Sequence, residues 1–259
     1  MSDFLHRFYS DANGKTGLFY IAQAGFILKS TKGISIGIDL YLSDCVERFD
    51  GFKRLSPKVF NPSEICLDYV VATHWHLDHF DIDSMPWLMS SKKTSLLAAD
   101  DCHEHVKTLG LDESRIIYIK EGDRINCSGI IVNAVFCDHG NSAPKAVGLV
   151  IEIDGYKIYI AGDTCLRIDK AHDIAKYGPF DVMIAPINGA FGNLNESDNV
   201  DLCAFHRPYL SIPCHFWTFA EQHGDPGLWK RMMNEKLPDQ KYLLMAPGEN
   251  VSLQDLLLN

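Results

Sequence analysis

The strongest chemical pattern in this sequence is a short run of histidines and aspartates. His74 and His76 are two residues apart, and Asp78 and His79 follow after Leu77. Side chains two positions apart in an extended segment lie on the same side, so the first two histidines can converge on one ion. Imidazole and carboxylate groups are ligands that zinc, manganese and iron accept. The spacing therefore predicts a divalent-metal site rather than a role in packing.

Three further candidate ligands come directly after predicted strands. Loops at strand ends on a rigid scaffold are a common place for functional side chains. Together with the histidine run, they would bring four strand ends to one site at one edge of a sheet. These ligands are His139 after the strand 130–136, Asp163 after 157–161 and His215 after 210–213.

The elements that must position these residues read as an α/β fold. Two groups of apolar, β-branched runs are separated by helical patterns, and Asp154-Gly155 is a strong hairpin signal. This order predicts two packed sheets with helices outside. The predicted strands are 18–28, 34–38, 67–73, 95–98, 115–119, 130–136, 147–153, 157–161, 182–185, 210–213, 242–245 and 251–253, and the predicted helices are 83–90, 100–109, 169–177 and 227–234.

Composition limits the class of protein. The chain has 259 residues, no repeat or long linker, 24 Lys and Arg against 34 Asp and Glu, and a net charge of −10. We expect one domain over residues 1–259, and the acidic balance disfavours nucleic acid as a partner. No apolar run approaches the roughly 20 residues of a membrane span. Eight cysteines without a CxxC pair or a signal peptide indicate buried thiols and a cytoplasmic protein.

These motifs resemble the metallo-β-lactamase superfamily and, within it, the family of L-ascorbate-6-phosphate lactonase. The resemblance implies an αββα sandwich, in which two mixed β-sheets pack face to face with helices outside. It covers almost the whole chain, and its matching segments are 23–26, 73–81, 146–147, 162–163, 212–215 and 225–226.

The resemblance also implies a hydrolytic centre with one or two divalent ions. Five histidines with two aspartates suit zinc, while the lactonase family implies manganese. A hydroxide between the ions would attack the carbonyl carbon of a small anionic lactone or ester, and Asp78 would orient it and take up a proton. By position, His74, His76 and His139 would hold the first ion, Asp78, His79 and His215 the second, and Asp163 would bridge them.

Other functions remain open at this point. The same site could cleave a phosphodiester in a nucleotide, an RNA or a phospholipid, although the negative charge disfavours long RNA. A di-iron redox protein on the same fold is a third hypothesis, which His76 opposes because such relatives place Glu there. A non-catalytic sensor is a fourth, and the complete set of seven ligands opposes it. A homo-oligomer is compatible with all four.

Three smaller patterns carry separate predictions. Asn188 follows a predicted strand and is the candidate substrate-binding residue, with a role in a turn as the equal alternative. The segment 33–37 matches the G-x-S-x-G pattern of serine hydrolases, but its flanks predict a strand and no following helix. Asp81 and Asp83 are predicted to cap the helix after the histidine run, and a hydrogen bond to a ligand histidine is the alternative for Asp81.

Overall fold

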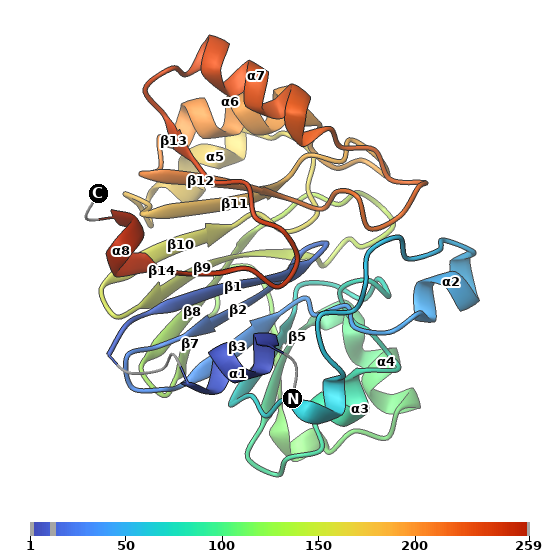
Figure 1. Cartoon of the computed structure of the whole chain (residues 1–259). Helices are drawn as coiled ribbons and strands as arrows, with labels where there is room; N and C mark the ends of the chain where they lie inside the picture. The colour runs from blue at the N-terminus through green and yellow to red at the C-terminus, as the bar shows by residue number, and fades with distance from the viewer. Residues whose placement is uncertain (1–2, 11–13, 258–259) are drawn as a thin grey trace. The chain divides into compact units, whose positions relative to one another are not determined.

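The computed structural model describes residues 3–10 and 14–257, and the chain divides into two compact units. The first unit spans Met1–Ile119 and Ala246–Asn259, and the second spans Lys120–Met245. Each unit contains one seven-stranded sheet, drawn as arrows in Figure 1. The predicted α/β class with two mixed sheets is confirmed, while the single domain over 1–259 stays a prediction.

The sheet of the first unit is antiparallel at one end and parallel at the other. Strands β14 to β3 pair antiparallel, and β3 to β6 pair parallel. The parallel strands β4 and β5 are almost wholly buried, which explains their continuous apolar sequence. In sheet order, the strands are β14 (Asn250–Ser252), β1 (Gly17–Ala22), β2 (Gly25–Lys29), β3 (Ser35–Ile38), β4 (Tyr69–Ala72), β5 (Ser95–Ala99) and β6 (Ile116–Ile119).

The sheet of the second unit has the same mixed character. Strands β7 to β10 pair antiparallel, and β10 to β13 pair parallel. The hairpin between β9 and β10 turns at Asp154 and Gly155, both with positive φ, as the sequence predicts. In sheet order, the strands are β13 (Lys241–Tyr242), β12 (Leu210–Cys214), β11 (Val182–Pro186), β10 (Tyr156–Ile160), β9 (Val147–Ile153), β8 (Ile130–Phe136) and β7 (Arg124–Cys127).

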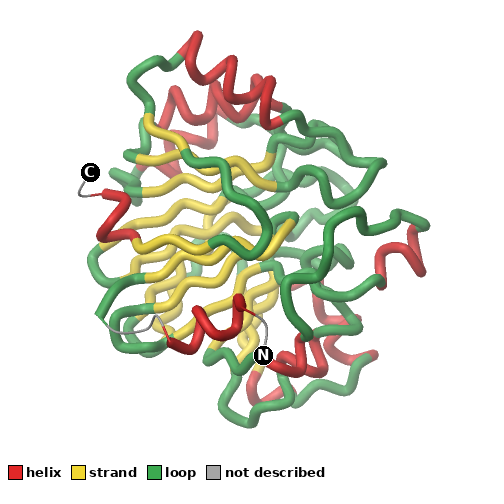
Figure 2. The backbone as a smooth tube through the Cα atoms, in the orientation of Figure 1, coloured by secondary structure: helices red, strands yellow, loops and turns green. Residues whose placement is uncertain are grey.

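Helices complete each unit, and Figure 2 shows them in red beside the yellow strands. The first unit has α1 (Asp3–Ser10), α2 (Cys45–Asp50), α3 (Met85–Leu88), α4 (His103–Thr108) and α8 (Leu253–Leu257). The second has α5 (Ile168–Ala175), α6 (Glu196–His206) and α7 (Pro226–Lys236). Within residues 3–10 and 14–257, no helix is long and apolar enough to cross a membrane.

One buried cluster joins the helices of the second unit to its sheet. Met183 and Ala185 alternate along β11 and share a face, where they pack in the same cluster as Trp229 of α7. The indole Nε1 of Trp229 donates to Asn199 Oδ1 of α6 at 2.8 Å. This packing fixes the strands whose ends carry the candidate ligands of this unit.

Several smaller predictions can now be compared with the structure. The predicted run 18–28 is two strands, β1 and β2. A strand is present where 242–245 was predicted, but it is the shorter β13 (Lys241–Tyr242). The segment 33–37 leads into β3 and not into a helix, and Ser35 Oγ donates to Asp68. All eight cysteines are unpaired thiols, and five are buried, as expected.

Candidate metal centre

The first donor set lies in the loop that directly follows β4. His74 Nε2 is 3.0 Å from His76 Nδ1, and His79 Nε2 is 3.7 Å from Asp78 Oδ2. Candidate ligand atoms of His74 and His79 also lie within 4.8 Å of each other. The loop folds back because the N–H groups of His79 and Phe80 both donate to the carbonyl of His76. A run of six residues thus gathers three imidazoles and one carboxylate.

Asp39 fixes the orientation of this loop. It follows β3 with a left-handed φ of 48° and is almost fully buried. Its Oδ2 lies 2.9 Å from His79 Nδ1 and accepts from Thr73 Oγ1 at 2.7 Å, while Oδ1 accepts from the Thr73 N–H at 2.8 Å. A carboxylate can only accept, so Nδ1 carries the proton and Nε2 is left with the lone pair a cation needs.

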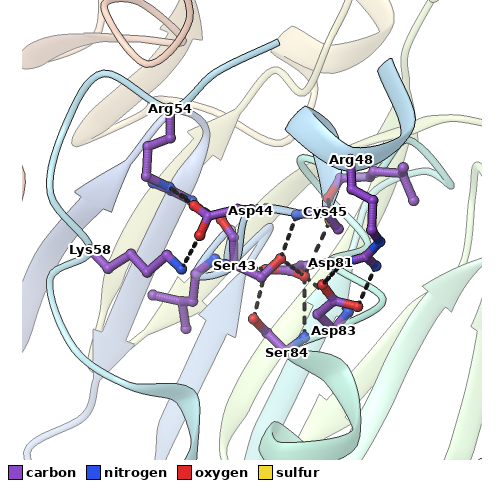
Figure 3. A network of polar contacts seen from close by, with 11 residues as sticks. Ser43, Asp44, Cys45, Arg48, Arg54, Lys58, Asp81, Asp83 and Ser84 are labelled. Carbon is purple, nitrogen blue, oxygen red and sulfur yellow. Dashed lines mark hydrogen bonds and ion pairs between the residues drawn. The ribbon is translucent and has the colours of Figure 1, made fainter. Parts of the chain in front are cut away.

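Asp81 follows the same loop, and Figure 3 shows its contacts with Ser43 and Ser84. It is fully buried and receives the hydroxyls of Ser43 and Ser84, each at 2.6 Å. It also accepts from the N–H groups of Asp83 and Ser84 in the turn before α3. The N-cap of α3 is Ser84, so Asp81 holds the turn that leads into the helix and does not cap the helix as predicted. The predicted capping role of Asp83 is wrong, because its carboxylate pairs instead with Arg48.

The second donor set comes from three strand ends of the second unit. His139 follows β8, Asp163 follows β10 and His215 follows β12. Asp163 Oδ2 lies 3.1 Å from His215 Nε2 and 3.9 Å from His139 Nε2. All three residues are at most 5% exposed. The sequence prediction that these distant segments converge holds within this unit.

The backbone around Asp163 explains why a glycine precedes it. Gly162 has a φ of 68°, and a Cβ there would lie 3.0 Å from the carbonyl oxygen of Val147. Any other residue would be strained and crowded at this position. Asn193 Nδ2 donates to Asp163 Oδ2 at 2.7 Å, and the Cys137 thiol donates to the carbonyl of Asp163 at 3.0 Å.

Charged neighbours shape the electrostatics on each side. In the first unit, burial and then the nearby Asp78 carboxylate raise the pKa of Asp50. In the second unit, hydrogen bonding to Arg167 lowers the pKa of Asp138, the residue next to His139. The Arg167 Nη1 to Asp138 Oδ2 distance is 2.7 Å. The Asp50 carboxylate is therefore close enough to Asp78 for the two to repel each other, and a cation bound at Asp78 would reduce that repulsion.

Each donor set has the chemistry that a divalent cation requires. Imidazole nitrogens and carboxylate oxygens are gathered at hydrogen-bonding to near-contact distances, with little exposure to water. Such groups repel one another when their lone pairs converge, and a shared cation removes that cost. The residues present therefore fit metal ions, and they leave the identity and number of the ions open.

Asn188 lies where the sequence prediction placed it, just past β11. It is fully buried, pairs with Asn195 in an isolated bridge, and donates from Nδ2 to the carbonyl of Ala190 at 3.5 Å. Its Oδ1 has no hydrogen-bond partner among the described residues. A buried amide oxygen without a donor is a potential ligand contact.

Two supporting residues escaped the sequence analysis. Asp39 follows a predicted strand, as Asp163 does, so the same signal could have identified it. Asn193 lies in an irregular loop between β11 and α6, and no local pattern marks it. Its role emerges only from the contact with Asp163.

Comparison with known proteins gives one family and many relatives. The family model described as the Beta-lactamase superfamily domain matches residues 41–206. A UPF0173 metal-dependent hydrolase of Polynucleobacter asymbioticus is 28% identical, and the alignment covers 93% of this chain and 87% of that protein. Another UPF0173 metal-dependent hydrolase, from Thermococcus kodakarensis, is 26% identical, and the alignment covers 90% of this chain and 98% of that protein.

Solved structures show the same fold at lower identity. Igni18, a metallo hydrolase of Ignicoccus hospitalis, aligns with a TM-score of 0.71 at 23% identity and covers 92% of this chain and 98% of its own. A possible metal-dependent hydrolase of Veillonella parvula aligns with a TM-score of 0.74 at 18% identity, covering 92% and 99%. At these identities the match shows the fold alone.

Proposed function

This chain belongs to the beta-lactamase superfamily, and we propose that it is a metal-dependent hydrolase that opens a small anionic lactone or ester. The observation that carries the proposal is the pair of donor sets, one in each unit, at the ends of strands; all of their members are buried except His76 and Asp78, which are partly exposed. The relatives named as metal-dependent hydrolases support the reaction class. The resemblance of segments 23–26 and 212–215 to the L-ascorbate-6-phosphate lactonase family supports the substrate class.

The proposed ligand assignment follows the family pattern. Bound divalent ions, zinc or manganese, would lower the pKa of a water molecule and polarise the substrate carbonyl. Within the second unit, Asp163 Oδ2 already lies near both His139 and His215, as a ligand shared between ions would require. We assign His74, His76 and His139 to one ion, Asp78, His79 and His215 to the other, and Asp163 to both.

The chain's own side chains supply positioning and proton transfer. Asp78 is partly exposed, so its carboxylate can orient the attacking water and then hold the proton it releases. Asp39 keeps His79 in one tautomer, and Asn193 holds the Asp163 carboxylate. Asn188 Oδ1 would accept a hydrogen bond from a hydroxyl group of the substrate, which suits a sugar-derived molecule.

The proposal is tested with gently purified protein. Elemental analysis first identifies the bound metal, and the protein is then supplied with zinc or manganese. A panel of sugar lactones, aryl esters and bis-p-nitrophenyl phosphate follows. We expect turnover of a lactone or ester above that of the phosphodiester. Failure of the loaded protein on every lactone and ester would contradict the proposal, and preferential cleavage of the phosphodiester would replace it.

The variant Asp163→Ala tests the assignment of the centre. Loss of a ligand should exceed the roughly 10- to 100-fold effect typical of residues that only support ligands. We therefore expect turnover to fall more than about a hundredfold, together with metal content. Asp173→Ala is the matched control, because Asp173 lies on α5 in the same unit and forms a surface ion pair with Lys176 at the end of that helix. Unchanged turnover in Asp163→Ala would exclude the assignment.

A further inference from the structure

We propose that Gln23 is a positioning residue for Asp78, holding its carboxylate in the orientation that binds a cation; this inference rests on the proposed metal centre. Gln23 Nε2 donates a hydrogen bond to Asp78 Oδ2 at 2.8 Å. Gln23 is fully buried, whereas the Asp78 side chain keeps 13% exposure. The contact joins the turn after β1 to the loop after β4, two segments of the first unit 55 residues apart in sequence.

The turn that carries Gln23 is closely packed and has an unusual backbone conformation. Gln23 has a φ of 57°, a left-handed conformation that costs free energy for any residue with a Cβ. Tyr20 OH donates to the Gln23 carbonyl at 3.3 Å. Two residues later, a Cβ on Gly25 would lie 3.0 Å from the Ala22 carbonyl oxygen and 3.1 Å from that of Asp39. The turn is therefore seated against the same segment that orients His79, and it presents the Gln23 amide to the ligand loop.

The hydrogen bond restricts the Asp78 carboxylate. An aspartate carboxylate has a broad, soft torsion about its last bond and can rotate when nothing holds it. Each carboxylate oxygen accepts in more than one direction, so Oδ2 can take the Gln23 N–H and still face His79 Nε2, 3.7 Å away. A fixed carboxylate loses less freedom when a cation binds, so the contact should raise cation affinity.

The second donor set repeats the arrangement with a different amide. Asn193 Nδ2 donates to Asp163 Oδ2 at 2.7 Å, as Gln23 does to Asp78. In each unit, one buried side-chain amide therefore holds the one carboxylate of the donor set. The parallel supports a shared purpose, because an amide N–H holds a carboxylate without competing for the cation.

The variant Gln23→Asn tests whether the side-chain amide must reach the Asp78 carboxylate. Asparagine tolerates a positive φ and keeps the amide, but it is one methylene shorter and cannot make the contact. Gln254→Asn is the matched control, because Gln254 lies in the same unit and its amide bonds Thr16. Affinity for Zn²⁺ and Mn²⁺ is measured by competition with a chromophoric chelator, and the absorption spectrum is recorded with Co²⁺ bound.

We expect Gln23→Asn to lower the affinity for the ion assigned to Asp78 about tenfold and to change the Co²⁺ spectrum, with the control unchanged. The metal-free Gln23→Asn protein should have a free energy of unfolding similar to that of the Gln254→Asn control. A similar stability together with a lower cation affinity would separate positioning from a purely structural role. Gln23→Gly, which takes the left-handed φ without strain, should show the same loss of affinity and serves if the asparagine variant does not fold. Affinities within twofold of wild type in both variants would overturn the inference. These measurements use no substrate, so inactivity of the wild-type protein would contradict the hydrolase and not this role of Gln23.

Discussion

His79 Nδ1 lies 2.9 Å from Asp39 Oδ2, and both side chains are at most 1% exposed. The pair joins the end of β3 to the ligand loop after β4. A buried carboxylate in this position fixes both the tautomer and the ring orientation of the histidine. Since Asp39 also accepts from the backbone and hydroxyl of Thr73, one carboxylate sets the geometry of the start and the end of the histidine run.

We expect Asp39→Asn to weaken cation binding by about 10- to 100-fold. The asparagine keeps the shape and tolerates the left-handed φ, but it weakens the hold on the Nδ1 proton of His79. One or more buried donors also lose their acceptor, which should lower the free energy of unfolding by about 1–3 kcal/mol. Chelator competition gives the affinity, and urea unfolding of the metal-free protein gives the stability.

Asp68→Asn is the control for this prediction. Asp68 Oδ2 accepts from the N–H and hydroxyl of Ser35, at the opposite end of β3 from Asp39. Its substitution should also lower stability but leave cation affinity within about twofold. Equal affinities in the two variants would show that Asp39 supports only the fold.

Asn193→Ala should lower cation affinity about tenfold, because Asp163 loses the donor that holds Oδ2. Metal content after dialysis against a weak chelator is the measurement. Asn126→Ala is the comparison within the same unit, since Asn126 is an exposed residue of β7 whose side chain accepts from the Gly129 N–H. Retention of as much metal by Asn193→Ala as by Asn126→Ala would contradict the prediction.

Local patterns predicted most of the strands because each is a short apolar run with clear ends. β8 and β9 match their predicted bounds, and the Asp154-Gly155 turn was identifiable because its two residues favour positive φ. The split between β1 and β2 was not predictable. Its turn contains Gln23 in a left-handed conformation, and nothing in the residue type signals that choice.

Helices with weak amphipathic patterns were also missed. α6 carries polar residues such as Asn199 on its buried side, where the Asn199 amide bonds the carbonyls of Ala185 and Pro186. Periodicity of apolar residues fails when a polar side chain is buried for its hydrogen bonds. The candidate ligands were predictable because metal chemistry restricts residue type, whereas residues that hold ligands in place, such as Asn193, depend on tertiary contacts alone.

His206 should make the protein less stable in acid. It packs among Tyr159 and Phe180, and neither ring nitrogen has a hydrogen-bond partner among the described residues. Burial lowers its pKa to about 4 from 6.5. The unfolded chain therefore binds the proton first, so stability is complete above about pH 6.5 and falls as the pH drops toward 4. When the pH falls from 7 to 4.5, this group should lower the free energy of unfolding by about 2 kcal/mol.

The variant His206→Leu tests this contribution. Urea unfolding of metal-free protein at both pH values should show a smaller acid loss in the variant than in wild type. His6→Leu is the control, because His6 is exposed on α1 and should leave the pH dependence unchanged. An identical acid loss in His206→Leu and wild type would mean that His206 is not the group responsible.

Asp81 and Asp83 offer the sharpest contrast between a buried and an exposed carboxylate. Asp81 is fully buried and accepts from two serine hydroxyls and several N–H groups, so Asp81→Asn should lower the free energy of unfolding by about 2–4 kcal/mol. Asp83→Asn removes only a surface ion pair with Arg48, which should cost about 1 kcal/mol or less.

Salt should distinguish the two variants, because it screens exposed charges far more than buried ones. Adding 0.5 M NaCl should reduce the difference in free energy of unfolding between wild type and Asp83→Asn. The corresponding difference for Asp81→Asn should stay the same. Urea unfolding with and without the salt measures both, and similar stabilities of the two variants would show that the Asp81 network does not anchor the ligand loop.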